Sequence, residues 1–314
     1  MSDQNDRNKI ALSVIVAVVS DTTQRQYDLT ILSGCLQALR HQVESPTLEI
    51  IVPYPAGVTE FEKARSEYLE VVFLPITDLK YYKIDGSSRE HHDELRAHGI
   101  AAAQGEIIAL IEDYARPDPH WSENIISEHK KDFAAIGGAI ENEVDRLLNW
   151  GVYFCDFGKY QNPVSEGETT FASDANISYK NTALMAVRSI WQDSYHETEV
   201  NWALRSLGEK IALSPKIVIF QHRTDLEFWS AMKERYVWGR SYAATRIKDI
   251  GNSKRFLYLL LTPLLPIILI IRMTSNIFRK GRNLNIFLKA LPLTILLEIS
   301  WSFGEFVGYL TGRS

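Results

Sequence analysis

The first 111 residues alternate between short apolar runs and longer stretches in which apolar positions recur at helical spacing. The short runs are rich in β-branched residues, as are strands that are buried on both faces of a sheet. These runs cover residues 11–18, 48–52, 70–74 and 107–111. Helical spacing is seen over residues 27–41 and 90–104. This repeated order predicts an α/β fold with a mixed, mostly parallel sheet flanked by helices.

The pattern becomes irregular after residue 115. It predicts a helix over 199–207, a strand over 217–221 and a charged amphipathic helix over 226–246. A hydrophobic content of 46% and a charged content of 23% are typical of a folded globular protein. We therefore predict a catalytic domain over residues 1–247 and a helical segment over 248–314.

The last sixty residues differ from the rest. Residues 256–271 carry no charge but are shorter than the roughly 20 residues that a bilayer span needs, and Pro263 and Pro266 predict a kink. Residues 286–309 are long enough to span. They contain Lys289, Glu298 and Glu305, however, and such charges are costly when exposed to lipid.

The charge of the chain is unevenly distributed. Residues 1–245 carry a net charge of −12, whereas residues 246–289 hold one acid and nine bases. Two full spans would place the basic loop 272–289 on the far side of the membrane, against the tendency of Lys and Arg to stay cytoplasmic. The pattern favours kinked in-plane or re-entrant helices on an anionic surface of the cell membrane, with the catalytic domain on the cytoplasmic side. Two full spans and a buried hairpin in a soluble protein are the alternatives.

Other features exclude classes of protein. Residues 1–9 are polar and residues 10–19 are too short to span, so no signal peptide is predicted. Cys35 and Cys155 match no metal or redox spacing and are expected to be buried free thiols. Nucleic acid is not an expected partner, because the first 245 residues are net acidic.

Two adjacent carboxylates, Glu112 and Asp113, follow the predicted strand 107–111. Ligands of open α/β sheets collect at the carboxyl ends of strands. Mg²⁺ or Mn²⁺ prefers oxygen ligands and is commonly shared with substrate phosphates. The pair therefore indicates a candidate site for a divalent cation and a diphosphate, with a solvated turn as the alternative.

The run GEIIALIEDYARPDPHW, residues 105–121, resembles the strand and acidic motif of family 2 glycosyltransferases, which have the GT-A fold. LSVIVAV resembles the first strand of that family, and LRAHGIAAAQGE resembles the helix before the acidic motif. FASDANISYKNTAL resembles the segment under the acceptor site, and HETEVNWALRSLGEKIALSP the segment that carries the base. The resemblance covers most of residues 10–245. It implies an inverting transferase, of the bacterial membrane-associated type, that uses a nucleotide sugar.

The resemblance assigns roles in the acidic motif, with departures. Glu112 falls on the first acid, which contacts the nucleotide, and Asp113 on the middle position. Tyr114 replaces the usual metal-binding aspartate, and a neutral phenol is a poor ligand for a hard dication. Either Asp113 takes over the metal, or metal binding is weaker or absent. Arg96 is assigned to the donor as well.

The family usually has acidic residues after the second strand for the nucleotide base, where this chain has Pro53-Tyr54-Pro55. Tyr54 is accordingly a candidate stacking surface for the base. His222 follows the predicted strand 217–221, where GT-A enzymes often place a histidine near the metal and diphosphate. A purely structural histidine is the alternative.

Counting back from Gly208, Glu197 matches the catalytic base of the family and Glu199 a second acid, which we assign to the sugars. Inverting transfer needs one base to take a proton from the acceptor hydroxyl as that hydroxyl attacks the anomeric carbon. The alternative is that Thr198 or Glu199 only caps a helix. If the acceptor is a phosphate, the base is dispensable.

Other polar residues match the family more loosely. Arg235 and Arg240 resemble the place where related enzymes hold the leaving diphosphate, and arginine suits phosphate geometry. A cationic helix face near lipid explains them equally well. Asp174 and Asn176 are candidates for contact with the donor sugar or the acceptor.

The predicted reaction moves a sugar from a nucleoside diphosphate donor to a membrane-bound acceptor, for instance a polyprenol-linked one, with Mg²⁺ or Mn²⁺ as the expected cofactor. Two alternatives stay open at this point. One is a transferase for a soluble acceptor, whose C-terminal segment serves only for localisation. The other, prompted by Tyr114, is a catalytically weakened nucleotide-sugar-binding or membrane scaffold protein.

Overall fold

The computed structural model describes residues 9–20, 29–43, 47–82, 90–247 and 250–312. The predicted start of the first helix at residue 27 and the predicted domain boundary at residue 248 lie outside them. The described chain forms two compact units. The first holds residues up to 82 together with 90–141 and 162–222, and the second holds 142–161 and 223–312. This division differs from the predicted division into 1–247 and 248–314. The reason is that the helices Leu147–Asp156 and Phe228–Ile247 pack with the C-terminal helices.

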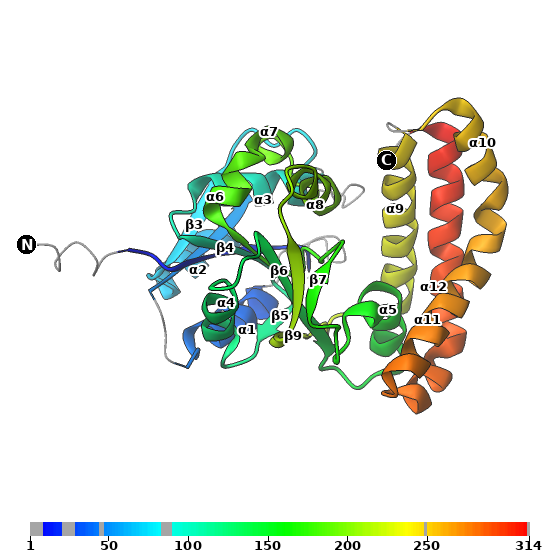
Figure 1. The fold of residues 1–314 in the computed structure, drawn as a ribbon, viewed down its shortest axis with the longest axis horizontal. Helices are drawn as coiled ribbons and strands as arrows, with labels where there is room; N and C mark the ends of the chain where they lie inside the picture. The colour runs from blue at the N-terminus through cyan, green and yellow to red at the C-terminus, as the bar shows by residue number, and fades with distance from the viewer. Residues whose placement is uncertain (1–8, 21–28, 44–46, 83–89, 248–249, 313–314) are drawn as a thin grey trace, which may run out of the picture. The chain divides into compact units, whose positions relative to one another are not determined.

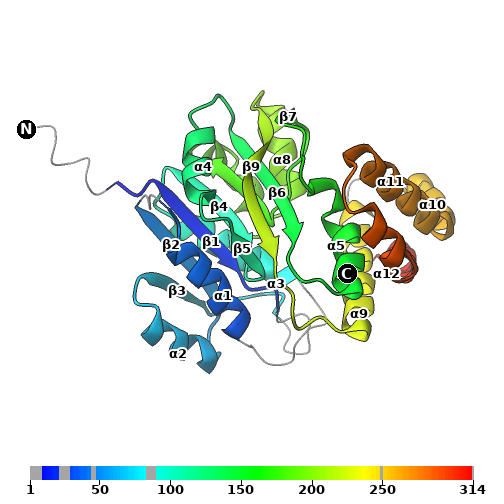
Figure 2. The ribbon, with the colours of Figure 1, turned by 90° about the horizontal axis from the view of Figure 1, so that it is seen from below.

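The first unit is built on one mixed sheet. Its strands are β1 (Leu12–Ala17), β2 (Leu48–Pro55), β3 (Val71–Ile76), β4 (Ile107–Glu112), β5 (Ala115–Pro117), β6 (Ala135–Asn142), β7 (Gly167–Thr169), β8 (Asn176–Lys180) and β9 (Ile211–Gln221). They lie in the order β3-β2-β1-β4-β8-β6-β9-β5, and β7 also pairs with β9. The strands from β3 to β4 are parallel, whereas β8 is antiparallel to both β4 and β6. Figure 2 shows β1 between β2 and β4.

Helices cover both faces of this sheet. They are α1 (Leu29–Arg40), α2 (Thr59–Glu67), α3 (Glu90–Ala102), α4 (Trp121–Glu128), α6 (Asn181–Ala186), α7 (Arg188–Trp191) and α8 (Glu197–Ser206). Figure 1 shows α3, α6, α7 and α8 on one side of the sheet and α1 and α4 on the other. The core under α3 and α8 joins Ile100 and Leu204 to Ile108 and Ile177 of the strands. The predicted α/β fold is therefore confirmed.

One predicted boundary is wrong. Pro53 was expected to end the second strand, but β2 continues through Pro53-Tyr54-Pro55. Its pairing with β1 stops at Ile51, and from there only β3 continues alongside. Proline lacks the N–H that a central strand donates, but it is tolerated where one side of the strand is an edge.

The second unit is helical. It contains α5 (Leu147–Asp156), the 3₁₀ turn η3 (Gly158–Tyr160), α9 (Phe228–Ile247), α10 (Asn252–Leu261), the 3₁₀ turn η4 (Thr262–Leu264), α11 (Leu265–Lys280) and α12 (Leu284–Thr311). The predicted interruption of the first apolar run is present, because η4 separates α10 from α11 at the two prolines. α12 packs against α9, α5 and α11.

Three glycines allow α9 and α12 to approach closely. A Cβ on Gly239 of α9 would collide with the backbone of Trp301, and one on Gly304 of α12 with the backbone of Tyr236. A Cβ on Gly308 would likewise meet the carbonyl of Arg240. The two helices therefore pack backbone to backbone at this crossing.

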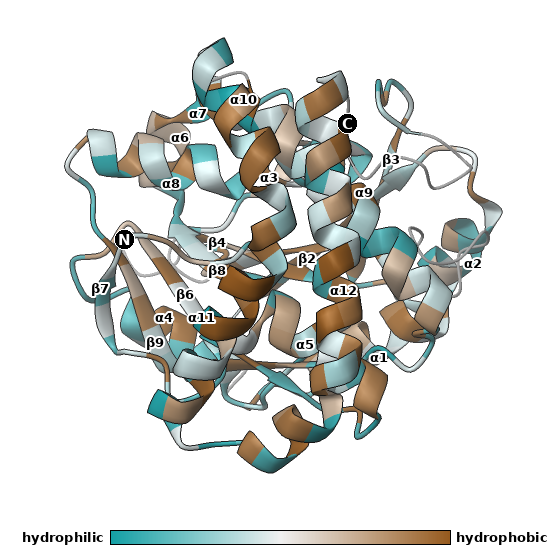
Figure 3. Cartoon of the chain, turned by 90° about the vertical axis from the view of Figure 1, so that its right-hand side faces the viewer, coloured by the Kyte–Doolittle hydropathy of each residue, from teal (hydrophilic) through white to brown (hydrophobic). Residues whose placement is uncertain are grey.

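Two helical segments, Asn252–Lys280 and Leu284–Thr311, are long and apolar enough to cross a membrane by length and composition. Only 6% of the most apolar window in the first is buried, against 33% in the second. Figure 3 shows hydrophobic residues recurring along α10, α11 and α12. An apolar surface of this extent is typical of a protein that contacts lipid or another protein.

Candidate active site

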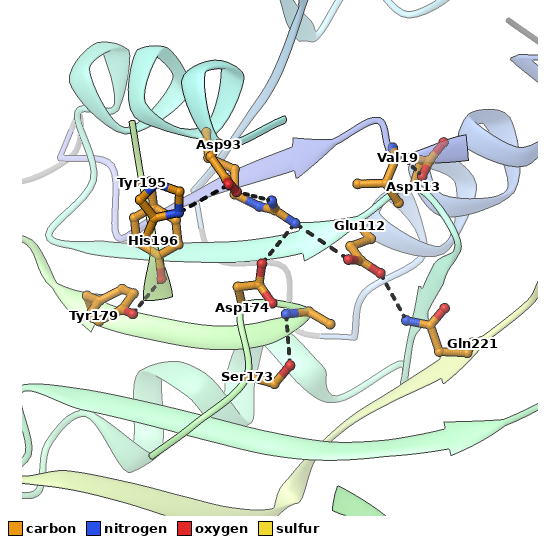
Figure 4. Close-up of polar contacts among 12 residues, drawn as sticks. Val19, Asp93, Glu112, Asp113, Ser173, Asp174, Tyr179, Tyr195, His196 and Gln221 are labelled. Carbon is orange, nitrogen blue, oxygen red and sulfur yellow. Dashed lines mark hydrogen bonds and ion pairs between the residues drawn. The ribbon is translucent and has the colours of Figure 1, made fainter. Parts of the chain in front are cut away.

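Glu112 is the last residue of β4 and Asp113 is the next one. Successive side chains of an extended strand point to opposite faces of the sheet. Glu112 accepts hydrogen bonds from Arg96 Nη2 and from Gln221 Nε2, both at 3.5 Å. Figure 4 shows Glu112 turned toward Asp174 and Gln221, with Asp113 apart from them near Val19.

Asp113 is only 1% exposed. One of its carboxylate oxygens accepts from the backbone N–H of Val19 at 3.1 Å, and the other accepts from Ser20 Oγ at 2.5 Å. These bonds tie the end of β4 to the end of β1. The adjacent carboxylates therefore do not converge on one ligand, and Glu112 is the one that faces the other acids.

Arg96 of α3 lies at the centre of this acidic cluster, and its side chain is completely buried. Its Nη1 donates to Asp93 at 3.0 Å, and its Nη2 reaches Asp174 at 3.0 Å as well as Glu112. Burial alone would lower the pKa of Arg96, but Asp174, Asp93, Glu112 and Glu197 outweigh it and raise the pKa. A permanent cation thus holds carboxylates from several segments together.

Glu197 is the first residue of α8, which begins two residues before the predicted helix 199–207. Glu197 contributes to raising the pKa of Arg96, after Asp174, Asp93 and Glu112, so the predicted base lies within electrostatic range of the cation that pairs with Glu112. The N-cap of α8 is His196, whose side chain makes no capping hydrogen bond. Glu199 lies two residues later in the same first turn, half-buried, and helps to raise the pKa of His196.

The predicted metal ligands do not fit a cation site. Both oxygens of Asp113 are engaged by Val19 and Ser20, and Tyr114 is 2% exposed in an apolar cluster. His222 donates its backbone N–H to the carbonyl of Tyr114 at 2.9 Å. Among the residues that the structure describes, no group of three or more His, Cys, Asp or Glu is arranged to hold a metal. Both carboxylate oxygens of Asp113 are thus already used as hydrogen-bond acceptors, and a metal-ligand role for His222 stays a prediction.

Two predicted ligand contacts are corrected by burial. Tyr54 is fully buried, its ring stacks on Phe61 at 4.6 Å between centroids, and its hydroxyl donates to Glu62 at 2.7 Å. A nucleotide base therefore has no access to its face. Asn176 is 1% exposed. Its amide accepts from Trp121 and donates to two backbone carbonyls, so its polar atoms hold the core and not a sugar.

The predicted diphosphate-binding arginines belong to the second unit. Arg235 is 4% exposed and pairs with Asp156 and, at 2.9 Å, with Glu298. Its guanidinium also lies 4.4 Å from the ring centroid of Trp301. Arg240 lies in the same helix, with its guanidinium 5.9 Å from the ring centroid of Tyr236. Contact of either arginine with a donor stays a prediction.

Sequence reasoning missed three residues of the site: Asp93, His196 and Gln221. Asp93 and Arg96 are three apart on one helix, a spacing that favours ion pairs and was a usable signal. His196 and Gln221 join the site only through tertiary contacts, to Asp93 and Glu112 respectively. No local pattern marks them.

No protein-family model matches the sequence, and no curated protein matches it. Among solved structures, the mannosyltransferase PcManGT from Pyrobaculum calidifontis, in complex with GDP-Man and Mn²⁺, is similar with a TM-score of 0.52 and 12% sequence identity. The match covers 98% of this chain and 89% of that one. At this identity the likeness concerns the fold alone. The chain thus has a mixed α/β fold similar to that of this mannosyltransferase, together with apolar C-terminal helices.

Proposed function

We propose that this protein is an inverting glycosyltransferase that moves a sugar from a nucleoside diphosphate donor to an acceptor at a membrane surface. The observation that carries the proposal is the cluster around Arg96. It gathers the acidic end of β4, Asp174 before β8 and Glu197 at the start of α8. The fold and the ligands of the similar mannosyltransferase make a sugar nucleotide the first class of donor to test.

The residues of the cluster have separate roles in this proposal. Glu197 is the general base that takes the proton of the acceptor hydroxyl. Glu112 contacts the nucleotide portion of the donor, and Asp174 contacts a sugar. In-line attack then depends on how firmly donor and acceptor are positioned, because the sugar passes through an oxocarbenium-like transition state.

The second unit supports a membrane-proximal acceptor. Phe256, Leu260, Ile267 and Ile271 are 59% to 64% exposed along α10 and α11. Basic residues alternate with these apolar stretches, a combination that favours an anionic bilayer surface. A catalytic unit tethered in this way meets acceptors at the height of the lipid headgroups. In this proposal the catalytic unit lies on the cytoplasmic side of the cell membrane.

The test combines binding and transfer. Purified full-length protein in detergent would be titrated with GDP-, UDP- and dTDP-sugars, beginning with GDP-mannose, with and without Mn²⁺. Transfer of radiolabelled sugar into a total lipid extract would then be followed, with the anomeric configuration of the product determined. We expect saturable binding of one nucleotide class and a product of inverted configuration. Binding of none of these donors would overturn the proposal.

A second candidate function is a nucleotide-sugar-binding protein with weakened catalysis. It is favoured by Asp113, which is held internally, and by buried Tyr114 in place of a metal ligand. The two candidates separate in the same experiment, because this second one predicts donor binding without transfer or donor hydrolysis.

A further inference from the structure

Asp93 joins the helix that carries Arg96 to the segment that enters α8. One of its carboxylate oxygens accepts from Arg96 at 3.0 Å, and the other lies 3.2 Å from Nδ1 of His196. Its backbone carbonyl also accepts from the N–H of Tyr195 at 2.9 Å. Figure 4 shows Asp93 beside both His196 and Tyr195. The two segments are therefore fastened by main chain and side chain at one residue.

His196 immediately precedes the proposed base. Its backbone is extended, with φ −113° and ψ 113°, and its carbonyl accepts from the N–H of Val200 at 3.1 Å. The residue at which a helix begins fixes the course of the first turn, since that turn has few hydrogen bonds of its own. A shift of His196 therefore displaces Glu197.

The groups that face His196 are mostly acidic. Asp93 faces it from α3, and Glu197 and Glu199 face it from its own helix. Ser194 Oγ lies 3.4 Å from Nε2. The hydrogen bond to Asp93 raises the pKa of His196 above its ordinary value, against an opposing effect of burial, and the two glutamates raise it further. The contact with Asp93 thus stabilises the protonated imidazole relative to that of an ordinary histidine.

We propose that His196 is a positioning residue for the transfer reaction. Its contact with Asp93 fixes the first turn of α8, and with it Glu197, relative to Arg96 and the acidic end of β4. His196 itself touches no substrate in this account. The kinetic part of the inference rests on the proposed function, whereas the structural part does not.

Two variants test the role. His196→Ala removes the contact, and we expect kcat to fall about 10- to 100-fold, the scale of a displacement near 1 Å, with KM for the nucleotide sugar changed less than about twofold. His196→Gln keeps an N–H that can reach Asp93 but does not titrate, so we expect it to recover part of kcat. The charged pair is complete below the ordinary pKa of histidine and is lost as the pH rises through the raised value. The alkaline fall of kcat should accordingly be present in the native protein and absent in His196→Gln.

His120→Ala is the matched control. His120 also pairs with a carboxylate, Glu123 at 3.1 Å, but both side chains are largely exposed in a pair three residues apart on the surface. We expect this variant to keep the native kcat and the native pH profile. A fall in kcat of the same size in both variants would overturn the inference.

Hydrogen exchange provides a readout that needs no activity. In His196→Ala, the amides of residues 200–201 should exchange faster than in His120→Ala at the same pH, while the thermal midpoint shows that the protein is folded. Unchanged exchange there would overturn the positioning role even if transfer is found. Faster exchange without any transfer in the native protein would support the positioning role and count against the proposed function.

Discussion

Arg96 in the first unit and Arg235 in the second are both buried arginines paired with carboxylates, but their surroundings differ. The partners of Arg96 retain exposed surface, with Asp93 12% and Glu112 and Asp174 each 13% exposed. The partners of Arg235 are closed off, with Asp156 8% and Glu298 1% exposed, and Trp301 covers the guanidinium.

The comparison separates the cation of the proposed site from a cation that holds helices together. Burying a charge is costly, and pairing compensates for that cost in both units. Around Arg96 the acids come from α3, β4 and the segment before β8, so three segments of the first unit converge on one cation. Around Arg235 the acids come from α5 and α12, so the same chemistry holds helices together.

The largest effect is expected at the base. Glu197→Gln should lower kcat by about 10²- to 10⁴-fold, because the amide cannot take a proton, while donor affinity and thermal midpoint change little. Steady-state kinetics with a hydroxyl acceptor measures this. Glu209→Gln, in the exposed turn after α8, is the control and should be fully active. A fully active Glu197→Gln would indicate an acceptor, such as a phosphate, that needs no base.

The next effect concerns the ion-pair cluster of the second unit, formed by Arg235, Asp156 and Glu298. Arg235→Met leaves Asp156 and Glu298 buried without their cation and should lower the free energy of unfolding by about 3–5 kcal/mol. Adding Asp156→Leu and Glu298→Met to it removes the unpaired charges and should restore most of the stability. Denaturant unfolding in detergent would compare the native, single and triple variants.

The triple variant also tests the donor role predicted for Arg235. We expect it to keep donor affinity and transfer, because the arginine serves the helical unit. A stable triple variant that no longer binds the nucleotide sugar would contradict the contrast and favour the role predicted from the sequence.

A smaller effect on stability is expected at His129, a buried histidine that is hydrogen-bonded to a hydroxyl group. Its Nε2 is hydrogen-bonded to Ser178 Oγ at 2.8 Å, and burial, together with the charge of Lys180, lowers its pKa to about 4. The unfolded chain therefore binds a proton between pH 6.5 and 4 that the folded chain does not, and stability falls as the pH falls. From pH 7 to pH 5 the native protein should lose about 2 kcal/mol more than His129→Gln. Parallel pH dependences of the two proteins would refute this.

The smallest effect is expected for an exposed arginine. Arg40 pairs with Glu70 on the surface, where water screens the charges and the long side chains lose entropy on pairing. Glu70→Gln should leave the thermal midpoint unchanged within error. In 1 M salt, the variant and the native protein should still have the same thermal midpoint. A clear destabilisation would show that the stability contributed by an arginine ion pair in this chain does not depend on its exposure.

Much of the first unit was predictable because its strands are buried on both faces. The run 107–111, for example, is apolar at every position and became the central strand β4. The course of β2 past Pro53 was not predictable, since it depends on β1 ending its pairing earlier than β3. The grouping of α9 with the apolar helices rests on Gly239, Gly304 and Gly308, whose complementarity is visible only once the helices cross.

For the candidate site, the sequence indicates which residues to consider, but it does not indicate where their side chains point. Glu112 and Glu197 are predicted from the family resemblance; Glu112 pairs with Arg96, and Glu197 contributes to raising the pKa of that arginine. The direction of a side chain is a tertiary property, however, so Asn176 was taken for a ligand although its amide holds the core. Asp113 was grouped with Glu112 because they are adjacent, yet adjacency at a strand end separates two side chains.

The three residues of the ion-pair cluster in the second unit are synthesised at different times. Asp156 leaves the ribosome first, Arg235 follows 79 residues later, and Glu298 follows after a further 63. At about 5–20 residues per second, the last interval takes roughly 3–13 s. During that time the arginine has only one of its acids, and α9 lacks the helix that it packs against. Completion of this unit must therefore wait until α12 has been synthesised, and chains that terminate before Glu298 should be preferred substrates for quality-control proteases.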